Sequence, residues 1–289
     1  MDKERQSYIC GAGAVLLWST VASVFKISLR HSAVLPLLLS ACLVSTLFFF
    51  GLLLFQYKLS LLKTCSGREL LRSALLGFLN PFLYYIVLFK AYTLLPAQEA
   101  LTLNFVWPIM LVLLSVPLLG QKIRPKSIAA ILMSFFGVFV IATRGNILAF
   151  RFTNPAGVLL AVGSSVIWAL FWIYNLKDNR DETTKLFLNF AFGSLFLCAA
   201  TILSSQGVVL NRKAYAGAVY IGLFEMGVTF FLWMRALRLS RTTAFVANLI
   251  YLAPFLSIVC IHFVVGEPIL LSTMVGLVLI VTGIVLQKL

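Results

Sequence analysis

Acidic side chains are the scarcest charged groups in this sequence. The chain has 289 residues, of which nine are Asp or Glu, and all charged residues together make up only 11%. Hydrophobic residues make up 61%, and the core of a soluble protein of this size could not bury so many apolar side chains. These proportions exclude a soluble protein and indicate a chain that lies almost entirely in a membrane.

Cysteine and histidine are also rare, which bears on metal and redox chemistry. The five cysteines are scattered singly, without the spacing of a metal or redox motif, and we interpret them as small apolar filler. His31 and His262 have no companion ligand nearby in the sequence. We therefore expect no metal site and no cofactor.

Motifs for nucleotide binding and for catalysis are missing as well. The sequence contains no Walker motif, no nucleotide-binding loop and no catalytic triad. An ATP-driven pump is therefore excluded within this chain, and we do not expect an enzyme. Any transport by it must draw on an ion gradient, a substrate gradient or a partner.

Long apolar runs, by contrast, recur along the whole chain. Each approaches the roughly 20 residues that a helix needs to cross a bilayer, and none alternates with the period of two expected of membrane strands. The sequence therefore predicts an all-α polytopic membrane protein with ten transmembrane helices and short connections. The predicted spans are Tyr8–Ser28, Ala33–Phe55, Ser73–Phe89, Ala97–Leu119, Ser127–Thr143, Pro155–Leu176, Leu186–Ser205, Ala214–Met234, Thr242–Val265 and Ile269–Leu286.

The net charge of +14 is explained by membrane topology rather than by a nucleic-acid partner. Placing the N-terminus in the cytoplasm puts sixteen basic residues inside and seven outside, which satisfies the positive-inside rule with both termini cytoplasmic. The inner residues are Lys3, Arg5, Lys58, Lys63, Arg68, Arg72, Lys122, Arg124, Lys126, Lys177, Arg180, Lys185, Arg235, Arg238, Arg241 and Lys288, and the outer ones are Lys26, Arg30, Lys90, Arg144, Arg151, Arg212 and Lys213.

The chain repeats itself. The segment "LLGFLNPFLYYIVLFKAY" (75–92) aligns with "YIGLFEMGVTFFLWMRAL" (220–237), and Asn80 then corresponds to Glu225. The alignment predicts a first repeat over residues 1–143, an outer connecting loop over 144–154 and a second repeat over 155–289. Because five spans is an odd number, the second repeat enters the membrane inverted, which is typical of secondary transporters.

A family resemblance rests on short segments in both halves. These are "LLWST" with Trp18, "NFVWPIMLVLL" leading to "GQK", "SVIWALFW" with Trp168, and "YLAPFLSIV" leading to "GEP". Over its full length the chain resembles the drug/metabolite transporter superfamily, in particular its ten-helix members with two EamA-type halves. Residues 18–20 and 104–108 are similar to the bacterial aromatic amino-acid exporter branch. The resemblance implies a location in the bacterial inner (cytoplasmic) membrane.

Glu225 is the first candidate for the functional site. A carboxylate within a span is expensive and is by default a functional group. Asn80 and Tyr84 lie on the matching helical face of the other half, so a central cavity between the repeats could hold all three. Glu225 could then bind substrate or couple transport to a proton. The alternative is a structural carboxyl group that bonds between helices or pairs with Arg235.

Glu99 is the second candidate for coupling. It lies in the first turn of its span, where a carboxylate also stabilises the helix dipole, so gating, binding and a purely structural role all remain open.

Amides and prolines recur at matching places in spans 4 and 9. Pro108 frees the carbonyl of Asn104, and Pro254 frees that of Ile250, which offers hydrogen-bonding groups and a bend for gating. The alternative is a kink needed only for packing. Asn104 and Asn248 are therefore candidate binding residues, together with their neighbours Trp107 and Tyr251.

Trp18 and Trp168 occupy equivalent mid-span positions, away from the membrane interfaces where Trp usually gathers. Two such rings could stack on an aromatic or cationic ligand, or could simply pack at a helix crossing.

The sequence thus favours a secondary transporter of small organic metabolites that works by alternating access, with export of aromatic or apolar amino acids as the leading hypothesis. A multidrug or cation exporter of the same architecture is the alternative, and an intramembrane enzyme or flippase component is a third class. The expected partners are a small-molecule substrate, the lipid bilayer and protons, with no nucleic acid. The sequence does not indicate an oligomeric state, and a monomer is compatible with it.

Overall fold

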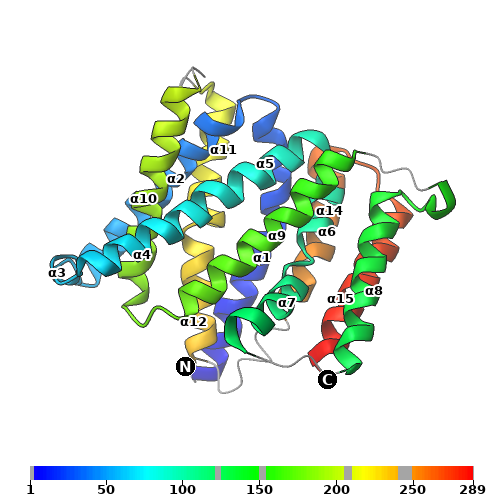
Figure 1. Ribbon diagram of the computed structural model, residues 1–289. Coiled ribbons are helices and arrows are strands. Elements are labelled where there is room, and N and C mark those ends of the chain that lie inside the picture. The colour runs from blue at the N-terminus through cyan, green and yellow to red at the C-terminus, as the bar shows by residue number, and fades with distance from the viewer. Residues whose placement is uncertain (1–2, 121–124, 150–153, 205–209, 240–248, 289) are drawn as a thin grey trace. The chain divides into compact units, whose positions relative to one another are not determined.

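The computed structural model describes residues 3–120, 125–149, 154–204, 210–239 and 249–288, and these residues form helices and short connections without any strand (Figure 1). The elements are α1 (Lys3–Leu29), α2 (Val34–Phe55), α3 (Ser60–Lys63), α4 (Gly67–Gly77), η1 (Phe78–Leu83), α5 (Tyr84–Leu94), α6 (Ala97–Asn104), α7 (Trp107–Leu119), α8 (Pro125–Ala142), η2 (Ile147–Ala149), α9 (Pro155–Leu176), α10 (Glu182–Leu203), α11 (Arg212–Tyr220), η3 (Ile221–Glu225), α12 (Val228–Leu239), η4 (Ile250–Leu252), α14 (Ala253–Val265) and α15 (Leu271–Lys288).

Among the described residues, ten apolar helical segments fall on the ten predicted spans, and residues 242–248 of predicted span 9 lie outside the described residues. Among the described residues, seven are long and apolar enough to cross a membrane, and three shorter ones, Ile128–Ala142, Ile250–Val265 and Leu271–Leu286, fall on predicted spans 5, 9 and 10. The prediction of an all-helical polytopic fold is confirmed.

Span 3 is longer than predicted. Its helical stretch runs over Gly67–Leu94 rather than Ser73–Phe89. The helix starts early because Ser66 and Glu69 form a capping box, in which each side chain bonds to the backbone N–H of the other residue. The capping-box hydrogen bonds therefore determine where this helix begins, and hydropathy alone does not predict that position.

The helices pack in two compact units, and each unit draws on both halves of the sequence. Unit 1 consists of Met1–Phe82 and Asn179–Cys260, which includes α1, α2, α4, α10, α11 and α12. Unit 2 consists of Leu83–Asp178 and Ile261–Leu289, which includes α5 to α9 and α15. The boundaries of the sequence repeats stay a prediction, because packing divides the chain in a different way.

Packing within each unit nevertheless follows the repeat. In unit 1, α1 packs on α12, and in unit 2 the equivalent helices α9 and α5 pack together. The other principal pairs join equivalent spans directly, α2 with α10 in unit 1 and α8 with α15 in unit 2, where Figure 1 shows the last two running side by side.

Polar side chains bond across these two self-equivalent pairs. The hydroxyls of Thr46 and Ser194 lie 3.1 Å apart between α2 and α10, 148 positions apart in the chain. Between α8 and α15, Ser134 donates to the carbonyl of Ile280 at 3.2 Å, 146 positions away. Because the repeat offset is about 145 along the chain, each contact joins positions that the repeat makes equivalent.

Candidate functional site

Unit 2 contains a connected polar cluster of three side chains from three helices. Tyr84 of α5 donates its hydroxyl to Asn104 Oδ1 at 3.4 Å, and Asn104 Nδ2 donates to Ser164 Oγ of α9 at 2.8 Å. Ser164 in turn donates to the carbonyl of Ala161 at 2.7 Å. The chain of bonds orients the Asn104 amide at the end of α6.

Several aromatic rings pack next to this cluster. The rings of Tyr84 and Trp168 lie 4.7 Å apart, and Trp168 also contacts Phe171 and Trp172 at 6.3 and 5.8 Å. Trp168 follows Ser164 by one helical turn, so both side chains lie on the same face of α9. We name Tyr84, Asn104, Ser164 and Trp168 the ring–amide cluster.

The structure thus brings together three residues that the sequence singled out and adds one that it missed. Ser164 was not predicted, although its place one turn before Trp168 in "GSSVIW" provides the signal. A half-buried amide between a hydroxyl and a buried indole can hydrogen-bond a polar group and stack a flat one. Trp107, at the start of α7, is half-buried, and its binding role stays a prediction.

Trp18 has the equivalent environment in unit 1. Its ring lies 5.5 Å from that of Trp233 and 6.3 Å from that of Phe230, both on α12. Two residues after Trp18, the Thr20 hydroxyl lies 2.7 Å from the hydroxyl of Tyr220. Each repeat therefore packs its mid-span Trp against rings of span 3 or span 8.

The helices that carry Asn80 and Glu225 both break at these residues. In span 3 the wider η1 turn spans Phe78–Leu83, and Asn80 has extended backbone angles of −150° and 119°. In span 8 the η3 turn ends at Glu225, and the Met226 N–H bonds to the Ile221 carbonyl five residues earlier. Such wide turns are frequent at functional sites, and both occur at the same place in the repeat.

The side chains at the two breaks are buried. Asn80 is 1% exposed and Glu225 is 7% exposed. Both polar atoms of the Asn80 amide lack a hydrogen-bond partner among the described residues, and a buried unsatisfied amide costs free energy unless water or a ligand meets it. Asn80 is therefore suited to receive a polar group.

Glycines hold these breaks tightly against neighbouring helices of unit 1. A Cβ atom on Gly77 would collide with the carbonyl oxygen of Asn189 in α10, and one on Gly222 would collide with that of Ala41 in α2. The two contacts are equivalent under the repeat, since Ala41 and Asn189 are separated by the same 148 positions as Thr46 and Ser194.

Glu99 lies in unit 2 with a basic partner. Arg144 Nε donates to its Oε1 at 2.7 Å, and the Glu99 side chain is fully buried. Nearby, the carboxylate of Glu267 accepts bonds from the backbone N–H groups of Ala97 and Gln98 at 2.9 and 3.3 Å and so caps α6. The ion pair gives Glu99 a structural task, and the coupling roles of Glu99 and Glu225 both stay predictions.

The two prolines stand at the start of new helices. Pro108 is the second residue of α7, after α6 has ended at Asn104, and Pro254 is the second residue of α14, after the η4 turn. Proline is well tolerated there because the first turn needs no N–H partner. Their roles in gating stay predictions.

Tyr251 lies in η4 and is buried, and its binding role stays a prediction. Asn248 lies outside the described residues.

Comparison with known proteins assigns the chain. The EamA-like transporter family matches residues 5–143 and 155–287, which is most of the sequence. The chain belongs to the EamA-like transporter family. It is therefore a multi-pass membrane protein built from two EamA-like halves, and the resemblance noted from the sequence is confirmed.

Named relatives agree with this assignment. The chain is 28% identical over 214 residues to the uncharacterized transporter YvbV of Bacillus subtilis, covering 73% of this chain and 69% of that protein. It is 27% identical over 255 residues to the aromatic amino acid exporter YddG of Ancylobacter novellus, covering 86% of this chain and 85% of that protein. A solved crystal structure shares the fold, with a TM-score of 0.67, 23% identity and coverage of 98% and 96%.

Proposed function

We propose that this EamA-like protein is a secondary transporter that exports aromatic or apolar amino acids. It lies in a bacterial inner membrane with both termini in the cytoplasm, in accordance with the distribution of its basic residues. The observation that carries the proposal is the ring–amide cluster, where a hydrogen-bonded amide stands beside a tryptophan and a tyrosine ring.

The chemistry of the cluster suits an aromatic amino acid. The Trp168 ring offers an apolar face on which a phenyl or indole side chain can stack. The Asn104 amide carries both donor and acceptor atoms, so it can bond to an ammonium or a carboxylate group. The similarity to a named aromatic amino acid exporter supports the same substrate class.

The helix breaks in spans 3 and 8 support an alternating-access cycle. Non-helical backbone at membrane depth is tolerated where it is buried in protein or lines a cavity, and transporters place it at their binding sites. Asn80 and Glu225 stand at these breaks, one in each repeat. We assign Asn80 to substrate binding and Glu225 to substrate binding and proton coupling.

Substitution of Trp168 tests the proposed substrate class. We expect Trp168→Ala to raise the half-saturation concentration for L-phenylalanine transport roughly tenfold, because the stacking surface is lost, and Trp168→Phe to raise it by no more than about threefold. The measurement is radiolabelled uptake into proteoliposomes that contain purified protein. Phe136→Ala, which removes an exposed ring from α8, is the matched control and should match the wild type. Wild-type affinity in Trp168→Ala would remove the ring from the site.

A further inference from the structure

The Ser164 hydroxyl sets the direction of the hydrogen bonds in the ring–amide cluster. Ser164 is fully buried on α9, and its hydroxyl donates to the carbonyl of Ala161, three residues earlier, at 2.7 Å. A hydroxyl has one proton, so towards Asn104 the Ser164 oxygen can only accept a hydrogen bond. The group that faces it at 2.8 Å is therefore the NH₂ of the Asn104 amide and not the amide oxygen.

This bond fixes the orientation of the Asn104 amide. With the nitrogen next to Ser164, the amide oxygen lies next to Tyr84, whose hydroxyl donates to it at 3.4 Å. A tyrosine hydroxyl can donate or accept, and 3.4 Å is long for a hydrogen bond between two oxygen atoms. The Tyr84 contact therefore constrains the amide less than the Ser164 contact does, and Ser164 is the group that prevents the amide from turning over.

Asn104 keeps hydrogen-bonding capacity for a further partner. An amide can donate twice and accept twice, and within the described residues Asn104 donates once and accepts once. One N–H and one oxygen lone pair remain, and the residue is half-buried rather than sealed by protein. The N–H suits a carboxylate and the lone pair suits an ammonium group. One amide can therefore hold both charged groups of an amino acid.

The Trp168 ring supplies a third point of contact beside this amide. It lies 4.7 Å from the Tyr84 ring and one helical turn beyond Ser164. An amino acid whose side chain stacks on Trp168 can place its carboxylate at the N–H and its ammonium group at the oxygen in one hand only, because the mirror image interchanges the two groups. If the amide turned over, the opposite hand would fit instead.

The equivalent place in the first repeat indicates that packing does not need this hydroxyl. The segment "GAVLLW" (13–18) aligns with "GSSVIW" (163–168), so the counterpart of Ser164 is Ala14. Ala14 is fully buried as well. Because alanine fits at this place in one repeat, Ser164→Ala is expected to fold, and the hydroxyl is left with the task of orienting the amide.

We propose that Ser164 is a positioning residue that makes the site stereospecific. By fixing the Asn104 amide it assigns one place to the carboxylate and another to the ammonium group, and so admits the L form of an aromatic amino acid over the D form. The inference rests on the proposed function, because it takes the substrate to be an amino acid held at the ring–amide cluster.

Competition between enantiomers tests the inference. The measurement is the concentration of unlabelled D- or L-phenylalanine that halves the uptake of radiolabelled L-phenylalanine into proteoliposomes. We expect the D-to-L ratio of these concentrations to be at least about tenfold in the unsubstituted protein, the effect of one lost charge-assisted hydrogen bond, and below about twofold in Ser164→Ala. Ser164→Thr keeps the hydroxyl and should restore the ratio. A hydroxyl that only supported the fold would change both concentrations alike, so an unchanged ratio in Ser164→Ala would overturn the inference.

Ser165 provides a matched control. It is the next residue of α9, is buried like Ser164, and makes the same local bond, from its hydroxyl to the carbonyl of Val162 at 2.6 Å. Ser165→Ala should keep the wild-type ratio, and an equal fall in both variants would contradict the role of Ser164. If Ser164→Ala is not monodisperse on size exclusion, Ser164→Cys takes its place, since a thiol is a weak donor and acceptor and should also lower the ratio.

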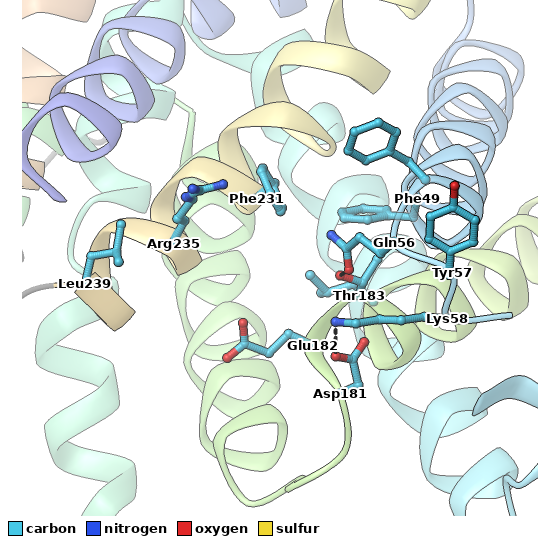
Figure 2. Close-up of a pocket in the computed structure, with 12 residues that line it drawn as sticks. Phe49, Gln56, Tyr57, Lys58, Asp181, Glu182, Thr183, Phe231, Arg235 and Leu239 are labelled. Atoms are coloured by element: carbon cyan, nitrogen blue, oxygen red, sulfur yellow. Dashed lines mark hydrogen bonds and ion pairs between the residues drawn. The ribbon is translucent and has the colours of Figure 1, made fainter. Parts of the chain in front are cut away.

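A competing location for such selectivity lies within unit 1. A cavity of about 620 Å³ is formed there where α2 and α12 end and α10 begins, with the Lys58–Asp181 ion pair and Arg235 on its walls (Figure 2). A guanidinium group can bind a carboxylate, so Arg235→Gln is the variant that tests this cavity. We expect it to keep the D-to-L ratio. A ratio lost in Arg235→Gln and kept in Ser164→Ala would assign the selectivity to the cavity and overturn the inference.

The same assays separate the possible failures. If the unsubstituted protein takes up no amino acid, the proposed function fails and the inference fails with it. If it takes up L-phenylalanine but D-phenylalanine competes equally well, the proposed function stands and the stereospecific role of Ser164 is wrong.

Discussion

Glu225 is a carboxylic acid at a position where the other repeat has the amide Asn80. Its counterpart Asn80 is also buried and stands at an equivalent helix break, so this position carries a polar group in both halves. An amide could satisfy a structural need in either half, but an amide does not titrate near neutral pH. An acid in only one half is therefore the pattern expected of a proton carrier.

We expect Glu225→Gln to fold and bind substrate but to lose uptake driven by a pH gradient. Counterflow needs no net proton movement and should be retained, so the ratio of the two activities in proteoliposomes is the measurement. Asn80→Ala is the matched variant and should weaken binding while keeping the response to pH. A wild-type pH response in Glu225→Gln would remove it as the coupling group, and Glu99 would be tested next.

Asp181 outside the membrane provides a pH-dependent contribution to stability. Burial by itself would raise the pKa of its carboxyl group, but the hydrogen bond from Lys58, the bonds from Thr184 and the Lys58 charge together hold the pKa below the ordinary 3.8. A carboxyl whose pKa is lower in the folded state stabilises that state above its unfolded pKa, and the contribution is lost as the pH falls through the folded pKa.

We therefore expect Asp181→Asn to lower stability by about 0.5–1 kcal/mol at pH 7, because the ion pair is partly exposed. Asparagine keeps one oxygen for the helix cap, so the substitution removes the charge and the oxygen that accepts the Lys58 hydrogen bond. Thermal unfolding in detergent should show the difference shrinking as the pH falls below about 4. The same substitution made together with Lys58→Met should show a smaller pH dependence, because the Lys58 contribution is absent and only the Thr184 bonds remain. An equal effect in both backgrounds would exclude the ion pair as its cause.

Among the elements, the broken helices of spans 3 and 8 depend on close packing at glycine. Gly77 and Gly222 precede the two breaks and bring them against the backbone of α10 and α2. Neighbouring helices without a hydrophobic driving force between them rely on such close approach. The breaks are therefore held in place by contacts that only glycine permits.

We expect Gly77→Ala and Gly222→Ala each to destabilise the protein by about 1–3 kcal/mol, since the added Cβ meets backbone that cannot move aside. Gly51→Ala in α2, where nothing lies within 4 Å of the added Cβ, is the control and should be neutral or slightly stabilising because alanine favours helix. Thermal unfolding of the four proteins in one detergent makes the comparison. Equal effects at positions 51 and 77 would contradict the packing account.

The sequence predicted the elements better than their interruptions. Apolar runs and charged ends are local signals, so the spans were confirmed, and Pro155–Leu176 was placed to the residue. The wide turns at Asn80 and Glu225 were not predicted, although Pro81, which directly follows Asn80 and lies inside η1, is a local signal for the first of them. Ser164 was missed because its role depends on its bond with Asn104, 60 residues away.

At the scale of the whole molecule, the repeat and the packing divide the chain differently. Sequence comparison separates residues 5–143 from 155–287, whereas each packing unit combines spans of both. Glycines and tryptophans that occur at matching positions in the two halves could reveal the repeat. It could not reveal that α1 packs on α12 and α9 on α5, because a one-dimensional alignment does not contain the partners of each helix.

The central claim is that this EamA-like protein moves amino acids by secondary transport. The most direct test is uptake of a panel of amino acids by proteoliposomes containing the purified protein, with and without an imposed pH gradient. The account predicts saturable uptake of aromatic and apolar amino acids, stimulated by the gradient, and no competition from hydrophobic cations. No uptake of any amino acid, together with accumulation of hydrophobic cations, would contradict it.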